Sequence, residues 1–172
     1  MKILLRIAQV ITAIILVFFS IGLFVNEFSY QTETVVDASP EQSFQVFSDP
    51  TLTSQWLTGF IKFEPIKGQP YTVDSQWKLF IESNGEVMEM TETVTAIILN
   101  KQFSFILDND VMLVDVDITF TAQGGQTLIV SNNKVNGKGL FWKSMLFLSK
   151  PFITAQNNVA YQKLAKLIEK SK

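Results

Sequence analysis

The hydrophobic and polar positions of this chain fall into three successive patterns. Nineteen residues, Ile7–Val25, are apolar except for Gln9, Thr12 and Ser20. Residues 60–132 largely alternate apolar and polar side chains with a period of two, which predicts β-strands. From residue 139 to residue 170 the apolar spacing becomes helical. The pattern predicts an apolar N-terminal helix, an antiparallel sheet and a long C-terminal helix.

The first apolar run is long enough to cross a bilayer. At the helical rise, its residues cover roughly 28 Å, close to the hydrocarbon thickness of a membrane. A cleaved secretory signal is the alternative, but its apolar region is shorter and ends at an Ala-x-Ala-like site. Here the nearest small residues, Ser20 and Gly22, lie inside the run. We therefore expect residues 1–26 to form an uncleaved transmembrane anchor and residues 27–172 to form one domain.

The charges beside the apolar run predict its orientation. Lys2 and Arg6 precede it, whereas Glu27 follows it and no basic residue appears before Lys62. Basic flanks are retained on the cytoplasmic side of membranes. We expect a single-pass protein with a cytoplasmic N-terminus and an extracytoplasmic domain.

The domain begins with a strand and two short helices. The β-branched segment 32–37 predicts the strand, with residues 26–31 as a link to the anchor. Ser39 and Pro40 suit the cap and first position of a helix that ends at Asp49, and a second helix runs from Pro50 to Leu57. The strands of the sheet are then expected at residues 60–63 (closed by Pro65), 75–81, 86–98, 103–107, 111–121 and 128–132, with tight turns at Asn84–Gly85 and Gly124–Gly125.

The C-terminal segment is expected to cover this sheet. Its apolar positions form a helical stripe, and Pro151 predicts a kink or break because proline has no N–H to donate. The predicted fold class is α+β, with a curved antiparallel sheet wrapped on a long C-terminal helix. The predicted covering stripe comprises Phe141, Met145, Leu148, Phe152, Ala155 and Val159, and Leu164, Leu167 and Ile168 continue the apolar face with some drift.

Composition removes several kinds of chemistry. The chain has no histidine and no cysteine, so Ser-His-Asp machinery, thiolate nucleophiles and imidazole or thiolate metal sites are excluded. Its 14 basic and 16 acidic side chains form no long block, which argues against a nucleic-acid partner. We expect no metal and no cofactor.

The order of these elements resembles that of the START-like, Bet v 1-like superfamily, also called SRPBCC or polyketide cyclase/dehydrase proteins. The likeness covers residues 32–170 and rests on several motifs. They are residues 36–41 with Phe44, Phe47, Asp49, Pro50 and Trp56; Gly68, residues 75–78 and Gly85; residues 92–95; and residues 101–105. Asp74 stands where such chains often have glycine. The resemblance implies a helix-grip fold with a mostly apolar cavity between sheet and helix, used for lipids, polyketides or quinones.

The predicted inner face is rich in aromatic and methionine side chains. Any one of them can belong to a packed core or line a ligand cavity. The acidic Glu92 falls on the same face, where it could orient a ligand or act as a general acid–base. Alternatively, Glu92 points to water or is satisfied by Tyr71 or Tyr161. The candidate cavity residues are Trp56, Trp77, Met88, Met90, Glu92, Phe103, Phe105, Met112, Phe120, Met145 and Phe152.

Three functions are compatible with these observations. The leading hypothesis is a membrane-anchored domain that binds or shuttles a hydrophobic small molecule or lipid. The second is an enzyme of the cyclase or hydrolase kind that uses Glu92, and the third is a ligand-free accessory protein of a membrane complex. The first is favoured because an apolar inner face accompanies the anchor at residues 7–25.

Overall fold

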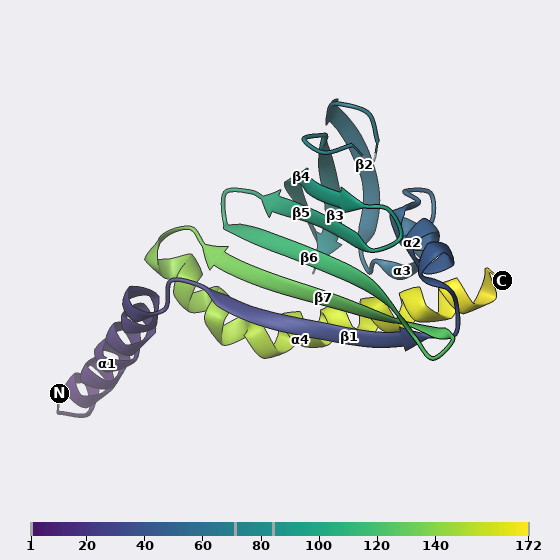
Figure 1. Ribbon diagram of the computed structural model, residues 1–172. Helices are drawn as coiled ribbons and strands as arrows, with labels where there is room; N and C mark the ends of the chain where they lie inside the picture. The colour runs from purple at the N-terminus through teal and green to yellow at the C-terminus, as the bar shows by residue number, and fades with distance from the viewer. Residues whose placement is uncertain (1, 71, 84, 172) are drawn as a thin grey trace.

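The computed structural model describes residues 2–70, 72–83 and 85–171. Eleven elements follow one another along the chain, with one long helix at each end (Figure 1). They are α1 (Lys2–Phe24), β1 (Phe28–Val36), α2 (Pro40–Ser48), α3 (Thr53–Trp56), β2 (Phe60–Lys67), β3 (Gln76–Ser83), β4 (Glu86–Ile98), β5 (Gln102–Asp108), β6 (Met112–Gln123), β7 (Gln126–Gly137) and α4 (Gly139–Lys170).

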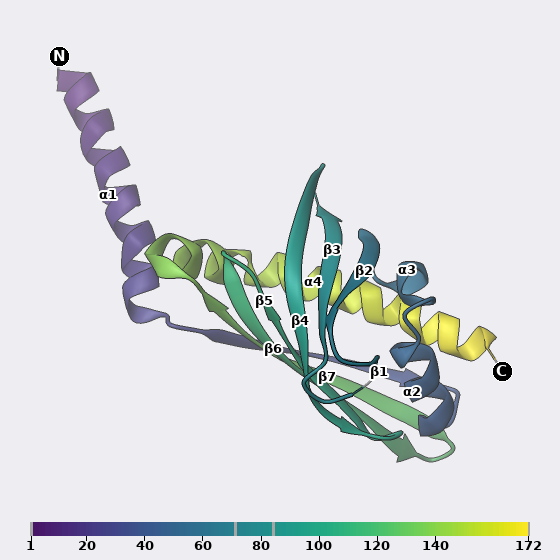
Figure 2. The same cartoon turned by 90° about the horizontal axis from the view of Figure 1, so that it is seen from above.

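The strands form one seven-stranded antiparallel sheet in the order β1-β7-β6-β5-β4-β3-β2. Strands β2 to β7 are a meander, and β1 pairs with β7, so that the first and last strands lie side by side. The sheet curls around α4, with β1 and β7 on one side of the helix and β2 to β4 rising above it (Figures 1 and 2). This is the helix-grip α+β fold that the sequence predicts.

Several strands are longer than predicted, β7 most of all, because it covers Gln126–Gly137 rather than residues 128–132. Strand β1 begins at Phe28 rather than at Thr32, because residues 28–36 pair continuously with residues 127–135 of β7. Strand β2 does not end at Pro65 but continues to Lys67, with a shift in its pairing register between these two residues. Strand β2 is at the edge of the sheet, where proline's missing N–H costs no ladder hydrogen bond.

Turn residues account for the tight connections. Gly124 and Gly125 both have positive φ and join β6 to β7 as expected. The turn between β3 and β4 contains Gly85 at a φ of 82°, while Asn84 lies outside the described residues. Asp74 has a φ of 67°. It therefore adopts the left-handed conformation that glycine accepts most easily.

The two short helices close one end of the core. Ser39 caps α2 by accepting a hydrogen bond from the Gln42 amide at 3.2 Å, and Pro40 occupies the first turn. This positions Phe44 and Phe47 against the sheet, where the Phe44 and Phe120 rings lie 5.4 Å apart. These buried aromatic rings form the centre of the hydrophobic core.

The long helix α4 packs on the sheet through only the C-terminal part of its predicted apolar face. Leu164 and Ile168 are completely buried, and Ala160 and Tyr161 nearly so. The stripe that contains Leu148 and Phe152 is exposed instead. The helix also continues unbroken through Pro151, so the predicted break does not occur.

The N-terminal helix α1 is long and apolar enough to cross a membrane. Only its end touches the domain: Gly22 is buried, and its amide donates a 2.9 Å hydrogen bond to Ser144 Oγ of α4. The Phe18 and Phe141 rings also lie 5.6 Å apart. The rest of α1 projects away from the domain (Figure 2).

The junction between β7 and α4 tolerates no side chain at Gly137. A Cβ there would lie 2.6 Å from the Lys143 amide nitrogen and 2.7 Å from the Trp142 carbonyl carbon. Because backbone must move, we expect Gly137→Ala to cost about 2 kcal/mol and to lower the melting temperature by roughly 6 °C. Thermal unfolding of the full chain in mild detergent measures this. Asn136→Ala, an exposed neighbour, is the control, and equal melting of both variants would contradict the prediction.

Candidate functional site

The candidate site is the inner face of the sheet above α4. Strand pairing puts Trp77, Glu92 and Leu107 in one row across β3, β4 and β5. The row continues to the buried Val114 and Val135, so all these side chains face the core side of the sheet. The alternation in the sequence therefore assigned Glu92 to the correct face.

The helix covers only part of this face. Among the strands, α4 packs mainly against β1 and β7, and its other neighbours are α1, α2 and α3. Over β3, β4 and β5 the inner side chains consequently keep part of their surface accessible. We call this partly accessible set the inner strip; its members are Trp77, Ile81, Glu92, Phe105, Leu107 and Met112.

Glu92 is the one acidic member of the inner strip. Its strand neighbours in register are Trp77 and Leu107, neither of which carries a charge. Among the residues that the structure describes, none pairs with its carboxylate or donates a hydrogen bond to it. Burial therefore raises the pKa of Glu92 to about 7.

The two tyrosines proposed as partners for Glu92 give different outcomes. Tyr161 is buried and is hydrogen-bonded to Ser131 of β7 rather than to Glu92. Tyr71 lies outside the described residues. Among the described residues, Glu92 is thus a carboxyl group between apolar side chains with no hydrogen-bond partner.

Two further buried polar atoms have no partner among the described residues. They are the Trp56 indole nitrogen and the Ser75 hydroxyl oxygen. Ser75 is only 1% exposed, and Trp56 stacks among core rings, with Phe47 at 5.6 Å and Tyr161 at 6.3 Å. An unpaired buried polar atom is costly, so each can bind a water molecule or a polar ligand atom favourably.

A polar cluster on β1, β7 and α4 was missed by sequence reasoning. Asn133 Nδ2 donates to Ser131 Oγ at 3.0 Å, and Ser131 is also bonded to Tyr161. Burial raises the pKa of Tyr30 to about 12 and also raises that of Tyr161. The period-two spacing of Phe28, Tyr30 and Thr32 was the available signal, but these residues were assigned partly to a link.

The predicted cavity residues occupy three different environments. Trp56, Met90, Phe103 and Phe120 are buried and take part in core packing, whereas Trp77, Glu92, Phe105 and Met112 belong to the inner strip. The exposed residues are Met88, near the β3–β4 turn, and Met145 and Phe152 on α4. The structure thus brings together only the second group as a partly accessible surface, joined by Ile81 and Leu107.

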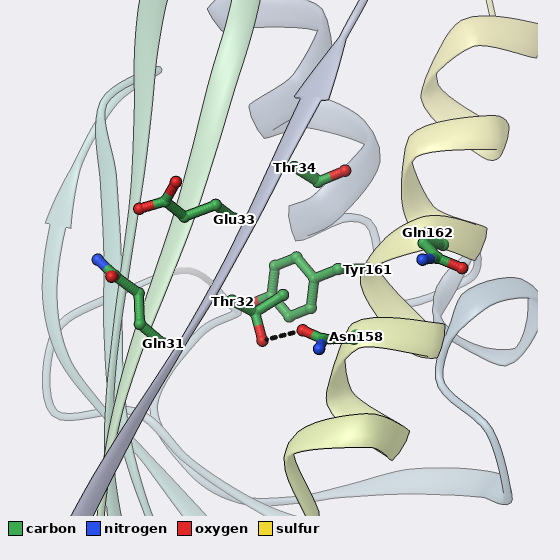
Figure 3. A pocket seen from close by; sticks show the side chains of 7 residues that line it. All are labelled: Gln31, Thr32, Glu33, Thr34, Asn158, Tyr161 and Gln162. Atoms are coloured by element: carbon green, nitrogen blue, oxygen red, sulfur yellow. Dashed lines mark hydrogen bonds between the residues drawn. The ribbon is translucent and has the colours of Figure 1, made fainter.

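A hollow of about 430 Å³ lies between the edge strand β1 and α4 (Figure 3). Thr32 Oγ1 donates to Asn158 Oδ1 at 2.8 Å across it and accepts from Asn157 Nδ2 at 3.0 Å. Its lining is polar: Gln31, Thr32, Glu33, Thr34, Asn158, Tyr161 and Gln162. Such a surface does not suit an apolar ligand.

A second hollow, of about 620 Å³, lies on the outer face of the sheet over β1, β7, β6 and β5. On its floor Asp117 accepts hydrogen bonds from Ser104 Oγ and Gln102 Nε2, each at 2.6 Å. Polar side chains from alternate positions, such as Asp115 and Lys134, surround it. Apart from Phe105, which also lines the second hollow, no member of the inner strip lines either of these two hollows.

The fold and the inner strip together define a START-like, Bet v 1-like SRPBCC domain. The sequence model of one family within this class, described as "Activator of Hsp90 ATPase homolog 1-like protein", matches residues 37–145, which is more than half of the chain. The chain belongs to this AHSA1 family. A comparison of the sequence with curated proteins gives no match.

Solved structures share the fold at low sequence identity. TTHA0849 from Thermus thermophilus is similar with a TM-score of 0.70 and 12% identity, over 84% of this chain and 99% of that one. SA2116 from Staphylococcus aureus has a TM-score of 0.68 and 13% identity, over 84% of this chain and 95% of that one. The di-domain ARO/CYC BexL from the BE-7585A biosynthetic pathway has a TM-score of 0.65 and 13% identity, over 86% of this chain and 51% of that one. Each likeness extends to the fold alone.

Proposed function

We propose that this protein binds or shuttles a hydrophobic small molecule, such as a lipid, a quinone or a polyketide, against the inner strip. The observation that carries the proposal is the row of Trp77, Glu92 and Leu107, in which a carboxyl group that has no partner among the described residues lies between two apolar side chains. Ligand sites commonly combine an apolar lining with a few polar groups that fix orientation. The row matches a ligand that is mostly apolar and carries one polar atom.

Glu92 sets the chemistry of that polar atom. With a pKa of about 7, the carboxyl group is close to half protonated at neutral pH. In its neutral form it can donate a hydrogen bond to a ligand carbonyl, and in its ionised form it can accept one from a ligand hydroxyl. Burial of apolar ligand surface against Trp77 and Leu107 would supply most of the affinity.

We further propose that α1 spans the membrane, with the N-terminus in the cytoplasm and the domain outside. The absence of basic residues between Arg6 and Lys62 supports this orientation. The buried contact of Gly22 with Ser144 supports a retained helix, because cleavage after α1 would remove a packed partner of α4. An anchored domain would remain close to the apolar molecules of the bilayer.

Titration of the full chain in mild detergent with a fluorescent fatty acid tests ligand binding. We expect saturable binding and an affinity about tenfold lower for Trp77→Ala, because an aromatic wall of the row is lost. Lys78→Ala is the matched control: its exposed side chain pairs with Glu89 at 2.6 Å, and its removal should leave the affinity unchanged. Absence of saturable binding, or equal loss in both variants, would reject the proposal.

Catalysis by Glu92 is a second candidate function. A carboxyl group with a pKa near the working pH can both give and take a proton, and burial supplies that pKa here. Cyclisation or hydrolysis of a bound apolar substrate would then require Glu92. Glu92→Gln should abolish turnover and leave fatty-acid binding within about threefold, since glutamine keeps the size and polarity of the group. Unchanged turnover would exclude this role.

A further inference from the structure

One face of α4 is apolar and uncovered. Five large apolar side chains recur at helical spacing between residues 141 and 159, and each is 45–59% exposed. We call this set the α4 ridge; it consists of Phe141, Met145, Leu148, Phe152 and Val159. It extends over roughly 27 Å of helix. Contiguous apolar patches of this kind on soluble surfaces indicate a binding partner.

The α4 ridge begins where the apolar helix α1 ends. Phe141, its first member, lies 5.6 Å from the Phe18 ring of α1. Just beyond the helix end, Asn26 Oδ1 accepts a 2.9 Å hydrogen bond from Lys143 Nζ. Figure 2 shows α1 meeting the first turns of α4 and running away from β1 and β7. If α1 spans the bilayer, the ridge starts at the membrane surface.

The charges of α4 favour a lipid surface as the partner. From Gly139 to Ile168 the helix contains no acidic residue and four lysines, at positions 143, 150, 163 and 166. Helices that combine an apolar face with basic side chains lie in the interface of bilayers that contain anionic lipids. Trp142, which is 36% exposed, adds an aromatic group typical of that interface.

We propose that the α4 ridge docks on the bilayer surface beside α1. The proposal rests on the membrane tether proposed above and adds a second attachment. A single helix with a short connection would let the domain swing, whereas docking of α4 would fix its orientation. The apolar side chains of the ridge would then lie among lipid chains, and Lys166, which is exposed on the same side of the helix, would meet lipid phosphates.

The absence of cysteine makes the test direct, because any introduced thiol is unique. The full chain carrying Leu148→Cys is labelled with an environment-sensitive fluorophore and reconstituted in vesicles of phosphatidylcholine and phosphatidylglycerol. We expect quenchers attached to lipid chains to lower its emission about twofold and aqueous iodide to have little effect. Asp115→Cys on the outer face should show the reverse, and Ile14→Cys in α1 should be quenched from the lipid.

Each alternative result of the quenching experiment decides whether the α4 ridge docks on the bilayer. Quenching of the Leu148 label by iodide alone would overturn docking, and protection from both quenchers would indicate a protein partner and also overturn it. Lipid quenching that is absent at Ile14 but present at Leu148 would reject the span and keep the docking. The fatty-acid titration is independent, because Leu148→Ser with Phe152→Ser should abolish docking without changing affinity for the fatty acid, while Trp77→Ala should do the opposite.

Discussion

Replacing Leu164 with alanine is expected to lower the free energy of unfolding by about 3 kcal/mol. The side chain is completely buried at the centre of the contact between α4 and the sheet, and Ala160 and Ile168 pack beside it in the same core. Alanine would leave a cavity that these neighbours cannot close, because they belong to the same rigid helix. Urea unfolding of the full chain in mild detergent, followed by tryptophan fluorescence, measures the change.

Leu148→Ala is the matched control on the same helix. Leu148 is 54% exposed, so its truncation should change the free energy of unfolding in detergent by less than about 0.5 kcal/mol. Leu164→Ala and Leu148→Ala are the same substitution on the same helix, so they differ only in the burial of the leucine side chain. Equal losses would show that α4 packs on the sheet through the α4 ridge, contrary to the structure.

Glu92→Gln is expected to stabilise the protein by about 3 kcal/mol above pH 7 and to have little effect at pH 4. The pKa of Glu92 rises from 4.5 to about 7 on folding, so the folded state holds this proton more tightly than the unfolded state. Below pH 4.5 Glu92 is protonated in both the folded and the unfolded state, so its burial does not reduce the free energy of unfolding. Between pH 4.5 and pH 7 only the unfolded state releases the proton, so stability falls as pH rises, and above pH 7 the loss is complete.

The measurement is the difference in unfolding free energy between variant and wild type across this range. Glutamine never ionises, so the difference should grow from about pH 4 to about pH 7 and then remain constant. Glu86→Gln, at an exposed residue on the same strand, is the control variant. A flat difference for Glu92→Gln would mean that its carboxyl group is solvated, which would also weaken its proposed role in orienting a ligand.

Much of the architecture follows from local patterns in the sequence. The meander was predictable because alternate side chains of a strand face opposite sides, so period two reports one wet and one buried face. The caps at Ser39 and Pro40 and the turn at Gly124–Gly125 depend on only a few neighbouring residues. For the start of β1 at Phe28 the local signal was weak, only the alternation of Phe28 and Tyr30, and pairing with the distant Val135 of β7 fixes it.

The candidate site was predictable in part for the same reason. Alternation assigned Glu92 to the inner face, but its neighbours Trp77 and Leu107 come from two other strands and depend on the register. The sequence treats Trp56 and Trp77 alike, although one packs among buried rings and the other lies in the inner strip. Only the assembled sheet and helix separate a core residue from an accessible one.

By itself, the sequence determined an apolar N-terminal helix, an antiparallel sheet and a long C-terminal helix, because hydrophobic periodicity and turn chemistry are local properties. It also excluded histidine and cysteine chemistry. The tertiary structure decided which side of α4 is buried: Leu148 and Leu164 are equivalent in a helical pattern, and only the positions of β1 and β7 select one of them. That choice leaves the α4 ridge exposed beside α1 and the inner strip partly uncovered, because a helix can pack closely against only part of a curved sheet.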